Sequence, residues 1–431
     1  MITNEVNHGP QLFLDRALLS KLPKSVAKEL SSRGLTTSGH NVKASFVGLM
    51  MVDNESYVFL PRGSCLDKQE EHVINASNTL KAVEKYSRIS KTKINLFDEG
   101  EGERRLNKLS LMRNLLDDFR QNGIYTKRRT INKLNFGRTD WKKTVNKIPP
   151  YPGVGGNPVY LDTYGSRKQY FNDCEIAVIH AHVISQLDKS LSWLVTGNLR
   201  PLAPELKEYG LPRGGGSYQL SRLKNELSQT YSDRDISLLK LLIQYIKSEA
   251  GSDQSNLIIG LSNFHFCWEY MLGQVLKYTV SLNNKLPAPA YIDTNGNVLT
   301  ANEKSMRTDI ILHDEGNQQC TVADAKYYAA TTVAKAPGWG DIVKQLFYEK
   351  ALSKLDINWK IKNAFIFPGC EPYLAKAQIR DRVNSTQSKH IFIDEFEPIH
   401  CYYANPMEVV SKFITGNKMP ELTEQLIANS T

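Results

Sequence analysis

One stretch of twenty residues, 307–326, constrains the fold of this chain more than any other part of the sequence. Two short runs of apolar or β-branched residues, 310–312 and 321–325, lie on either side of a segment rich in turn-forming residues, 314–317. Alternating or β-branched runs are typical of strands, and Asp, Gly and Asn are typical of the turns that join them. The stretch therefore predicts a β-hairpin.

Three charged side chains stand at the ends of the two predicted strands. Asp309 begins the first strand, while Asp324 and Lys326 are two positions apart and therefore point to the same face. Burying two carboxylates is costly unless a cation or a close pairing offsets their desolvation. We therefore expect Asp309 and Asp324 to bind Mg²⁺, with Mn²⁺ as a substitute. Lys326 would stabilise charge on a phosphate and either orient or deprotonate the attacking water. The alternative is a surface ion pair between Asp324 and Lys326.

A helix is predicted on the carboxyl side of this hairpin, over residues 341–352, with Asp341 as its N-cap after a glycine-punctuated turn. Its apolar side would consist of Val343, Leu346, Phe347 and Ala351. Gln345 and Tyr348 lie off that stripe, three residues apart, and share a face. That face would either look into the site, where Gln345 could bond a phosphate or a metal-bound water, or be solvated.

A second helix is predicted on the amino side, over residues 263–278, and it carries Glu269 among aromatic and apolar residues. A carboxylate in such surroundings is a metal ligand, a partner in an interhelical ion pair, or exposed to solvent. We take Glu269 as a weaker candidate for the metal site than the two aspartates.

Four motifs together carry a resemblance to a known family. They are Phe264-His-Phe-Cys-Trp-Glu269, Asp324-Ala-Lys-Tyr-Tyr328, Asp341-Ile-Val-Lys-Gln-Leu-Phe-Tyr348 and Phe136-Gly-Arg-Thr-Asp-Trp-Lys-Lys-Thr-Val145. The chain resembles the LlaJI-type restriction endonucleases, which are related to the McrC nuclease subunit and to the PD-(D/E)XK superfamily. The resemblance implies a Mg²⁺-dependent endodeoxyribonuclease of the type II kind, active in restriction or antiviral defence. It also implies a possible partner, an McrB-like AAA+ GTPase.

The same resemblance implies a nuclease core with a central mixed sheet flanked by helices. Its catalytic residues would be Asp309, Asp324, Lys326, Glu269 and Gln345, with the three acids as metal ligands. We expect an α/β chain, α+β overall, in three regions. These are a small β-rich domain over 1–100, a helical middle region over 101–250 and the PD-(D/E)XK nuclease domain over 251–431.

In the first two regions the hydrophobic pattern also predicts individual strands and helices. Residues 44–52 and 56–60 read as a β-hairpin, and residues 109–119, 176–194 and 236–246 carry helical apolar stripes. Basic residues interleaved with aromatics predict contact with DNA in the middle region. They are Lys127, Arg128, Arg129, Arg138, Lys142 and Lys143. The alternatives are a solvated loop anchored by Trp141 or, by resemblance, a surface that faces the partner GTPase.

Composition agrees with a nucleic-acid enzyme without requiring one. The chain has 54 Lys and Arg against 45 Asp and Glu, a net charge of +9 that favours phosphate partners. Six cysteines show no metal-finger spacing and no disulfide framework, and the amino terminus has no signal region, so a cytoplasmic protein is expected.

Two further readings stay open. No phosphate-binding loop is recognisable, so any NTPase would be another chain. Cutting both strands generally needs two sites, which favours a homodimer. The non-enzymatic alternative is a DNA-binding or assembly subunit with a degenerate core, and the presence of both aspartates and the lysine argues against it.

Overall fold

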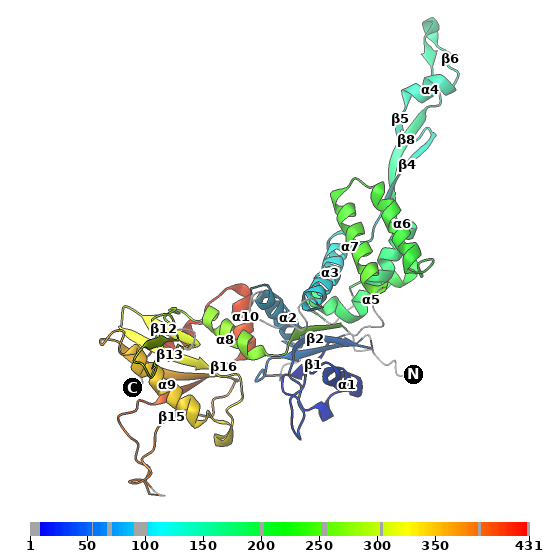
Figure 1. Cartoon of the computed structure of the whole chain (residues 1–431). Coiled ribbons are helices and arrows are strands. Elements are labelled where there is room, and N and C mark those ends of the chain that lie inside the picture. The colour runs from blue at the N-terminus through cyan, green and yellow to red at the C-terminus, as the bar shows by residue number, and fades with distance from the viewer. Residues whose placement is uncertain are drawn as a thin grey trace. The chain divides into compact units, whose positions relative to one another are not determined.

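The structure is a computed structural model that describes residues 9–53, 55–66, 71–89, 101–198, 202–250, 257–301, 305–386 and 389–428, with the backbone alone at 101–107, 207 and 250. The chain divides into two compact units. Unit 1 comprises residues 1–8 and 107–255, and unit 2 comprises residues 9–106 and 256–431. The fold is a mixture of helices and several sheets (Figure 1).

Unit 2 begins with a four-stranded sheet in the order β1-β3-β2-β9. Its strands are β1 (Gln11–Leu14), β2 (Val47–Val52), β3 (Glu55–Leu60) and β9 (Leu257–Leu261). The antiparallel pair β2 and β3 confirms the predicted N-terminal hairpin. The sheet is packed between helix α1 (Lys24–Ser32), preceded by the 3-10 turn η1 (Leu19–Lys21), and helix α2 (His72–Ile89). Because β9 completes this sheet, residues far apart in the sequence share one core.

The second sheet of unit 2 has the order β12-β13-β14-β16-β15 and mixes parallel and antiparallel pairs. Its strands are β12 (Ile310–Asp314), β13 (Gln319–Ala325), β14 (Lys360–Pro368), β15 (Lys376–Ala377) and β16 (Ile399–Ala404). The antiparallel pair β12 and β13 confirms the hairpin predicted from the 307–326 stretch. A separate small hairpin is formed by β10 (Ala290–Ile292) and β11 (Val298–Thr300).

Helices cover both faces of this second sheet. They are α8 (Phe264–Val275), α9 (Trp339–Leu352), α10 (Pro406–Thr415) and α11 (Pro420–Ile427), and the 3-10 turn η6 (Val333–Lys335) precedes α9. Tyr348 and Leu352 of α9 pack on Val322 of β13. On the opposite face the Thr321 hydroxyl donates to the carbonyl of Leu426 in α11. Helix α10 contacts both α2 and α8, so these three helices lie side by side (Figure 1).

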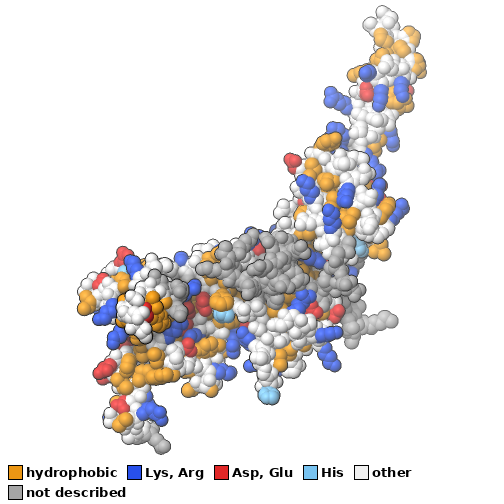
Figure 2. Space-filling model, in the orientation of Figure 1, with side chains coloured by type: hydrophobic (Ala, Val, Ile, Leu, Met, Phe, Trp, Pro, Cys, Tyr) orange, Lys and Arg blue, Asp and Glu red, His pale blue; other side chains and the backbone are white. Residues whose placement is uncertain are grey.

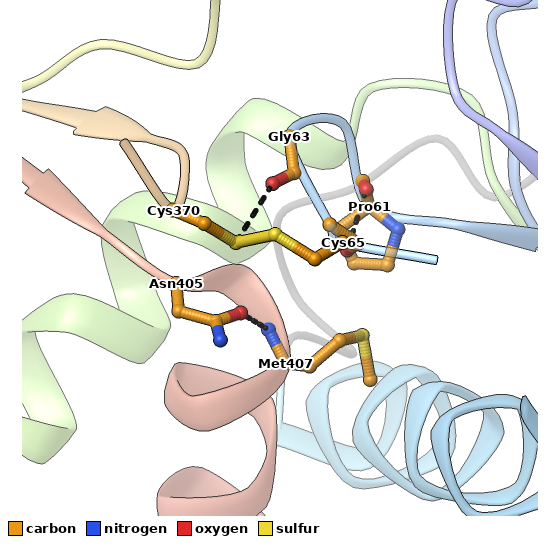
Figure 3. Close-up of a disulfide and its surroundings, with 7 residues drawn as sticks. Pro61, Gly63, Cys65, Cys370, Asn405 and Met407 are labelled. Atoms are coloured by element: carbon orange, nitrogen blue, oxygen red, sulfur yellow. Dashed lines mark hydrogen bonds between the residues drawn. A yellow bond between two sulfur atoms is a disulfide. The ribbon is translucent and has the colours of Figure 1, made fainter. Parts of the chain in front are cut away.

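A disulfide joins Cys65, which follows β3, to Cys370, which follows β14 (Figure 3). The expectation that the cysteines form no disulfide was therefore wrong. Two cysteines 305 positions apart leave no spacing signal, because their proximity depends on how the two sheets pack. Gly63 lies in the same loop at φ +80°, and a β-carbon there would come within 2.6 Å of the Pro368 carbonyl oxygen. Only glycine fits this close approach.

Unit 1 is built around four long helices. They are α3 (Glu101–Asn122), α5 (Glu175–Thr196), α6 (Gly216–Ser228) and α7 (Asp233–Ala250), with the 3-10 segment η4 (Pro204–Tyr209) against α5. The predicted stripes on α3, α5 and α7 supply buried residues such as Leu115, Leu187 and Leu242. His180 of α5 is fully buried, and its Nδ1 accepts a hydrogen bond of 3.1 Å from the Tyr125 amide. Burial lowers the pKa of His180 to about 4.

Residues 125–171, which we call the arm, project from the helices of unit 1 (Figure 1). The arm contains the antiparallel sheet β4-β8-β5, formed by β4 (Lys127–Leu134), β5 (Arg138–Thr139) and β8 (Tyr164–Phe171). Helix α4 (Trp141–Lys147), strands β6 (Tyr151–Pro152) and β7 (Pro158–Val159) and the turn η3 (Val154–Gly156) complete it. Trp141 is 59% exposed and touches the Tyr160 ring, so the alternative of a loop anchored to a core by Trp141 does not hold. None of the helices in the described ranges is long and apolar enough to cross a membrane.

Candidate active site

Two carboxylates come together where β12 begins and β13 ends. The ladder pairs Ile310 with Ala323, so the next position on each strand places Asp309 opposite Asp324, on the same face of the sheet. The Asp309 carboxylate accepts a hydrogen bond of 3.0 Å from the Ala325 amide. Burial raises the pKa of Asp309 well above its usual range, and the Asp324 and Glu269 carboxyls add to the increase. Asp309 as a whole residue is exposed, so it forms the open edge of a site whose carboxyl groups are crowded together.

Lys326 is held between two acids. Its Nζ lies 2.8 Å from Asp324 Oδ2 and 2.7 Å from Asp341 Oδ1, and its side chain is only 14% exposed. Burial alone would lower the pKa of Lys326, but the contacts with Asp324 and Asp341 raise it overall. The two acids therefore favour the charged form of the lysine. The ion pair between Asp324 and Lys326 that was the alternative is present, but it is not on the surface, because Asp324 is 6% exposed.

Asp341 is a site residue that the sequence did not assign to this position. Gly338, and not Asp341, is the N-cap of α9. Asp341 lies in the first turn of the helix and turns its carboxylate to Lys326. An acidic residue in a first turn is also favourable to the helix dipole, so its sequence context gave no sign of the second role.

One oxygen of the site depends on a cation. Asp324 Oδ2 is buried, and its close partner among the described residues is the Lys326 ammonium, 2.8 Å away. Lys326 is shared with Asp341, so one positive charge faces two carboxylates, and Asp309 stands opposite Asp324 as a third. Crowded carboxylates of this kind are costly unless a further cation reaches them. Mg²⁺ is commonly bound by one or two carboxylates and several waters, so Asp309 and Asp324 fit this ion. No group of three or more His, Cys, Asp or Glu side chains is arranged to hold a metal in the part of the chain that the structure describes.

Glu269 of α8 stands near the two aspartates but is not in the same close cluster. It is half-buried, and burial, followed by the charge of Asp324, raises its pKa. Arg307, Lys326 and Lys344 oppose this increase. Glu269 therefore belongs to the electrostatic surroundings of the site.

Gln345 and Tyr348 occupy neither of the positions predicted for them. Gln345 is fully buried, and its Nε2 donates to the carbonyls of Val322 and Ala364 at 2.7 and 3.2 Å, which ties β13 to β14. Tyr348 is also buried and donates its hydroxyl to the Arg307 carbonyl. The predicted apolar side of α9 is wrong in part, because Val343 and Phe347 are exposed.

The site strand is also attached to the N-terminal sheet. The Tyr327 hydroxyl accepts a hydrogen bond of 2.8 Å from the Arg62 amide and bonds the carboxyl of Asp15. Asp15 also accepts from the Phe46 amide, and burial raises its pKa to about 6. Tyr327 directly follows Lys326, so the first sheet fixes the end of the strand that carries the site.

The family whose description is LlaJI restriction endonuclease matches residues 46–393, which is most of the chain. The chain belongs to the LlaJI restriction endonuclease family. This confirms the resemblance seen in the sequence motifs. The four acids of the site, Lys326 and residues 125–171 lie inside the matched part of this LlaJI family member. The acids are Glu269, Asp309, Asp324 and Asp341.

Two similar proteins add detail. The "Type II restriction enzyme BsuMI component YdjA" of Bacillus subtilis (strain 168) is 30% identical over 273 residues, 57% of this LlaJI family member and 55% of the relative. The aligned region thus spans about half of the relative's length. A chain in the solved half-complex of Thermococcus gammatolerans McrB AAA+ hexamers with bound McrC is 13% identical, with 95% of this chain and 99% of that chain covered. Its TM-score of 0.36 is too low to carry an argument about the fold.

The predicted DNA-binding residues all lie on the arm, and Lys and Arg side chains are spread along it (Figure 2). The arm contains ten basic and two acidic residues, so it carries +8 of the chain's net charge of +9. Arg128 and Arg129 occupy adjacent positions on β4 and therefore opposite faces of the ribbon. Lys127 pairs with Glu226 at the base of the arm, at 2.6 Å. The net charge of this LlaJI family member is small for its length, but nearly all of it lies on the arm.

Proposed function

We propose that this chain is a Mg²⁺-dependent endodeoxyribonuclease of a restriction system, of the type II kind, with its site at Asp309, Asp324 and Lys326. The observation that carries the proposal is the pair of opposed carboxylates, Asp309 and Asp324, with the ammonium of Lys326 2.8 Å from the buried Asp324 oxygen. Membership of a restriction endonuclease family supports the reaction class. The name of the Bacillus subtilis relative, a component of a type II restriction enzyme, supports the same biological setting.

Each residue has a distinct task in this reaction. Asp309 and Asp324 would hold Mg²⁺ (or Mn²⁺), and Glu269 is a weaker third candidate. When bound, the ion supplies a polarised water and charge stabilisation for the phosphate. Lys326 remains protonated, so it stabilises negative charge that develops on the phosphate. Gln345 acts at a distance, because its hydrogen bonds fix the two strands beneath the site.

We also propose that the β12–β16 sheet with α8 and α9 is a PD-(D/E)XK core. The order of elements supports it: a helix with Glu269, a strand start with Asp309, a strand with Asp324 and Lys326, and a helix with Gln345. The mixed sheet with helices on both faces is the arrangement that the resemblance implied.

The test is cleavage of supercoiled plasmid DNA by the wild-type chain and by Asp324→Asn, with Mg²⁺, with Mn²⁺ and with EDTA. We expect cleavage that requires metal, and a loss of about a hundred- to a thousand-fold in Asp324→Asn, because removal of a major electrostatic group costs about 10²–10³. Asp233→Asn, which changes an exposed carboxylate of unit 1, is the matched control. Full cleavage by a folded Asp324→Asn protein would contradict the proposal.

A second candidate function is a nuclease subunit that requires an McrB-like AAA+ GTPase. The word "component" in the relative's name favours a system of several chains. The arm would then face the partner, DNA or both. Cleavage that appears only after such a GTPase is added would favour this candidate. A chain that binds DNA but stays inactive under both conditions would instead be a non-catalytic binding or assembly subunit.

We further propose that the enzyme acts in the cytoplasm, where restriction enzymes meet foreign DNA, and that a homodimer supplies the two sites for double-strand cleavage. The basic residues Lys127, Arg128, Arg129, Arg138, Lys142 and Lys143 are proposed to contact DNA phosphates. Sedimentation analysis without duplex DNA measures the oligomeric state, and the same analysis with duplex DNA measures DNA binding.

A further inference from the structure

A pocket of about 540 Å³ lies beside the candidate active site, between α9 and the segment that leads into β12. Its walls include Arg307, Val343, Lys344, Phe347 and Tyr348. Arg307 is two residues before Asp309, so the pocket is adjacent in the chain to the proposed metal-binding carboxylates. Its volume is within the range of about 300–1,000 Å³ found for pockets that bind small ligands.

The outer side of α9 is unusually apolar for a surface helix. Trp339, Val343 and Phe347 are 67%, 43% and 60% exposed. They are spaced by four residues, so their side chains form one stripe along the helix. Val343 and Phe347 belong to the pocket wall. Exposed aromatic rings of this kind are suitable for stacking on bases or packing on sugars.

Two cations accompany this stripe. The carboxylate charges of Asp324 and Asp309 reach Lys344, and Arg307 and Lys344 both act on Glu269. The two cations therefore lie within electrostatic reach of the acids, and both line the pocket. A DNA strand near four carboxylates would be repelled unless nearby cations compensate.

Tyr348 contacts the backbone of Arg307 and the ammonium group of Lys344. Its hydroxyl donates to the Arg307 carbonyl, and its ring lies 5.4 Å from Lys344 Nζ. Asn283 fixes the next residue, since it bonds the Thr308 amide and hydroxyl, both at 2.9 Å. The backbone is thus fixed at two successive residues, Arg307 and Thr308, directly before Asp309, which connects the pocket to the site.

We propose that this pocket binds the DNA strand next to the scissile phosphate, with Arg307 and Lys344 on its phosphates and Phe347 against a sugar or base. The inference rests on the proposed function, because it takes the acids beside the pocket as the place of cleavage. The combination of two cations with an exposed aromatic stripe favours a nucleic-acid strand over a second copy of the chain.

The test measures binding of a duplex that contains 5-iodouracil, in EDTA so that the DNA is not cleaved. Irradiation should crosslink the DNA to Trp339 or Phe347, which peptide mass spectrometry locates even if the arm dominates the affinity. Phe347→Ala should remove most of that crosslink and weaken binding about tenfold. Arg307→Ala/Lys344→Ala should lower the slope of log affinity against log salt by about 2, because each lost phosphate contact lowers it by about 1.

Matched controls are Lys350→Ala, an exposed lysine on the same helix outside the pocket, and Tyr231→Ala, an exposed aromatic residue of unit 1. Both should behave as the wild type. The inference is overturned if no crosslink maps to α9, if the pocket variants bind as the controls do, or if Phe347→Ala converts a dimer into a monomer. Failure of the proposed function is distinguishable: a wild-type chain that crosslinks through Phe347 but never cleaves, alone or with a partner, keeps the pocket and loses the nuclease.

Discussion

The position of Lys326 between Asp341 and Asp324 leads to a quantitative prediction. Both acids lie within 2.8 Å of its ammonium group, so each draws the charge toward itself. Asp341→Asn keeps the shape and one acceptor oxygen but removes the charge. Lys326 should then pair more closely with Asp324, the carboxylate that we propose as a metal ligand, and compete with Mg²⁺ there.

The magnitude follows from the strength of the lost contact. A hydrogen bond between charged groups contributes about 1.5–3 kcal/mol. The Asp341 side chain is about one-third exposed, and solvent screening favours the lower end. A change of about 1.4 kcal/mol corresponds to a factor of ten. We therefore expect about a tenfold higher Mg²⁺ concentration at half-maximal cleavage, with a smaller loss at saturating Mg²⁺.

The assay is plasmid cleavage under single-turnover conditions over a Mg²⁺ titration. Glu421→Gln is the matched control, because Glu421 is an exposed acid in the first turn of α11 and tests the helix-dipole effect alone. Asp341→Glu should restore part of the wild-type response. An Asp341→Asn enzyme with the Mg²⁺ dependence of the wild type would refute the reasoning.

Three further predictions concern stability. Gln345→Met should lower the free energy of unfolding by about 1–3 kcal/mol, since two hydrogen bonds are lost, and leave the Mg²⁺ dependence of cleavage unchanged. Urea unfolding measures the stability and plasmid cleavage measures the Mg²⁺ dependence. Unchanged stability with an altered Mg²⁺ dependence would make Gln345 catalytic. Burial lowers the pKa of His180 to about 4 from 6.5, so the unfolded state binds more protons between these values and stability falls as the pH drops from about 6.5 to about 4. The loss should reach about 3 kcal/mol, measured by urea unfolding at several pH values, and a wild-type slope in His180→Gln would contradict it. Cys65→Ser should lower the thermal midpoint under oxidising conditions and have no effect in reductant, because loop closure by the disulfide stabilises by up to about 5 kcal/mol; equal midpoints under both conditions would show that the bond contributes nothing.

The parts of the fold that local patterns determine were predicted from the sequence. The β12–β13 hairpin follows from two β-branched runs around a turn, and this is enough to place Asp309 opposite Asp324. The long helices of unit 1 likewise follow from regular apolar stripes. In each case the determining residues lie within a few positions of one another, so backbone propensity and periodicity carry the information.

The rest depends on contacts between distant residues. The apolar stripe of α9 was misassigned because a buried face was assumed to contain apolar residues only. Gln345 can be fully buried because two strand carbonyls from β13 and β14 receive its amide, and no local pattern reveals them. Asp341 in the site, β9 in the N-terminal sheet and Cys65 bonded to Cys370 have the same origin, since each partner is fixed only by tertiary packing.

The concentration of charge on the arm has a consequence for how the protein behaves in solution. With +8 of the net charge on residues 125–171, the remainder of the chain is close to neutral, so the isoelectric point near 9.0 is the property of one projecting hairpin. Retention on a cation exchanger should then report the state of the arm, and a bound polyanion or acidic partner would abolish it. The steep fall of association rate with ionic strength that charged surfaces produce should likewise originate mainly on the arm.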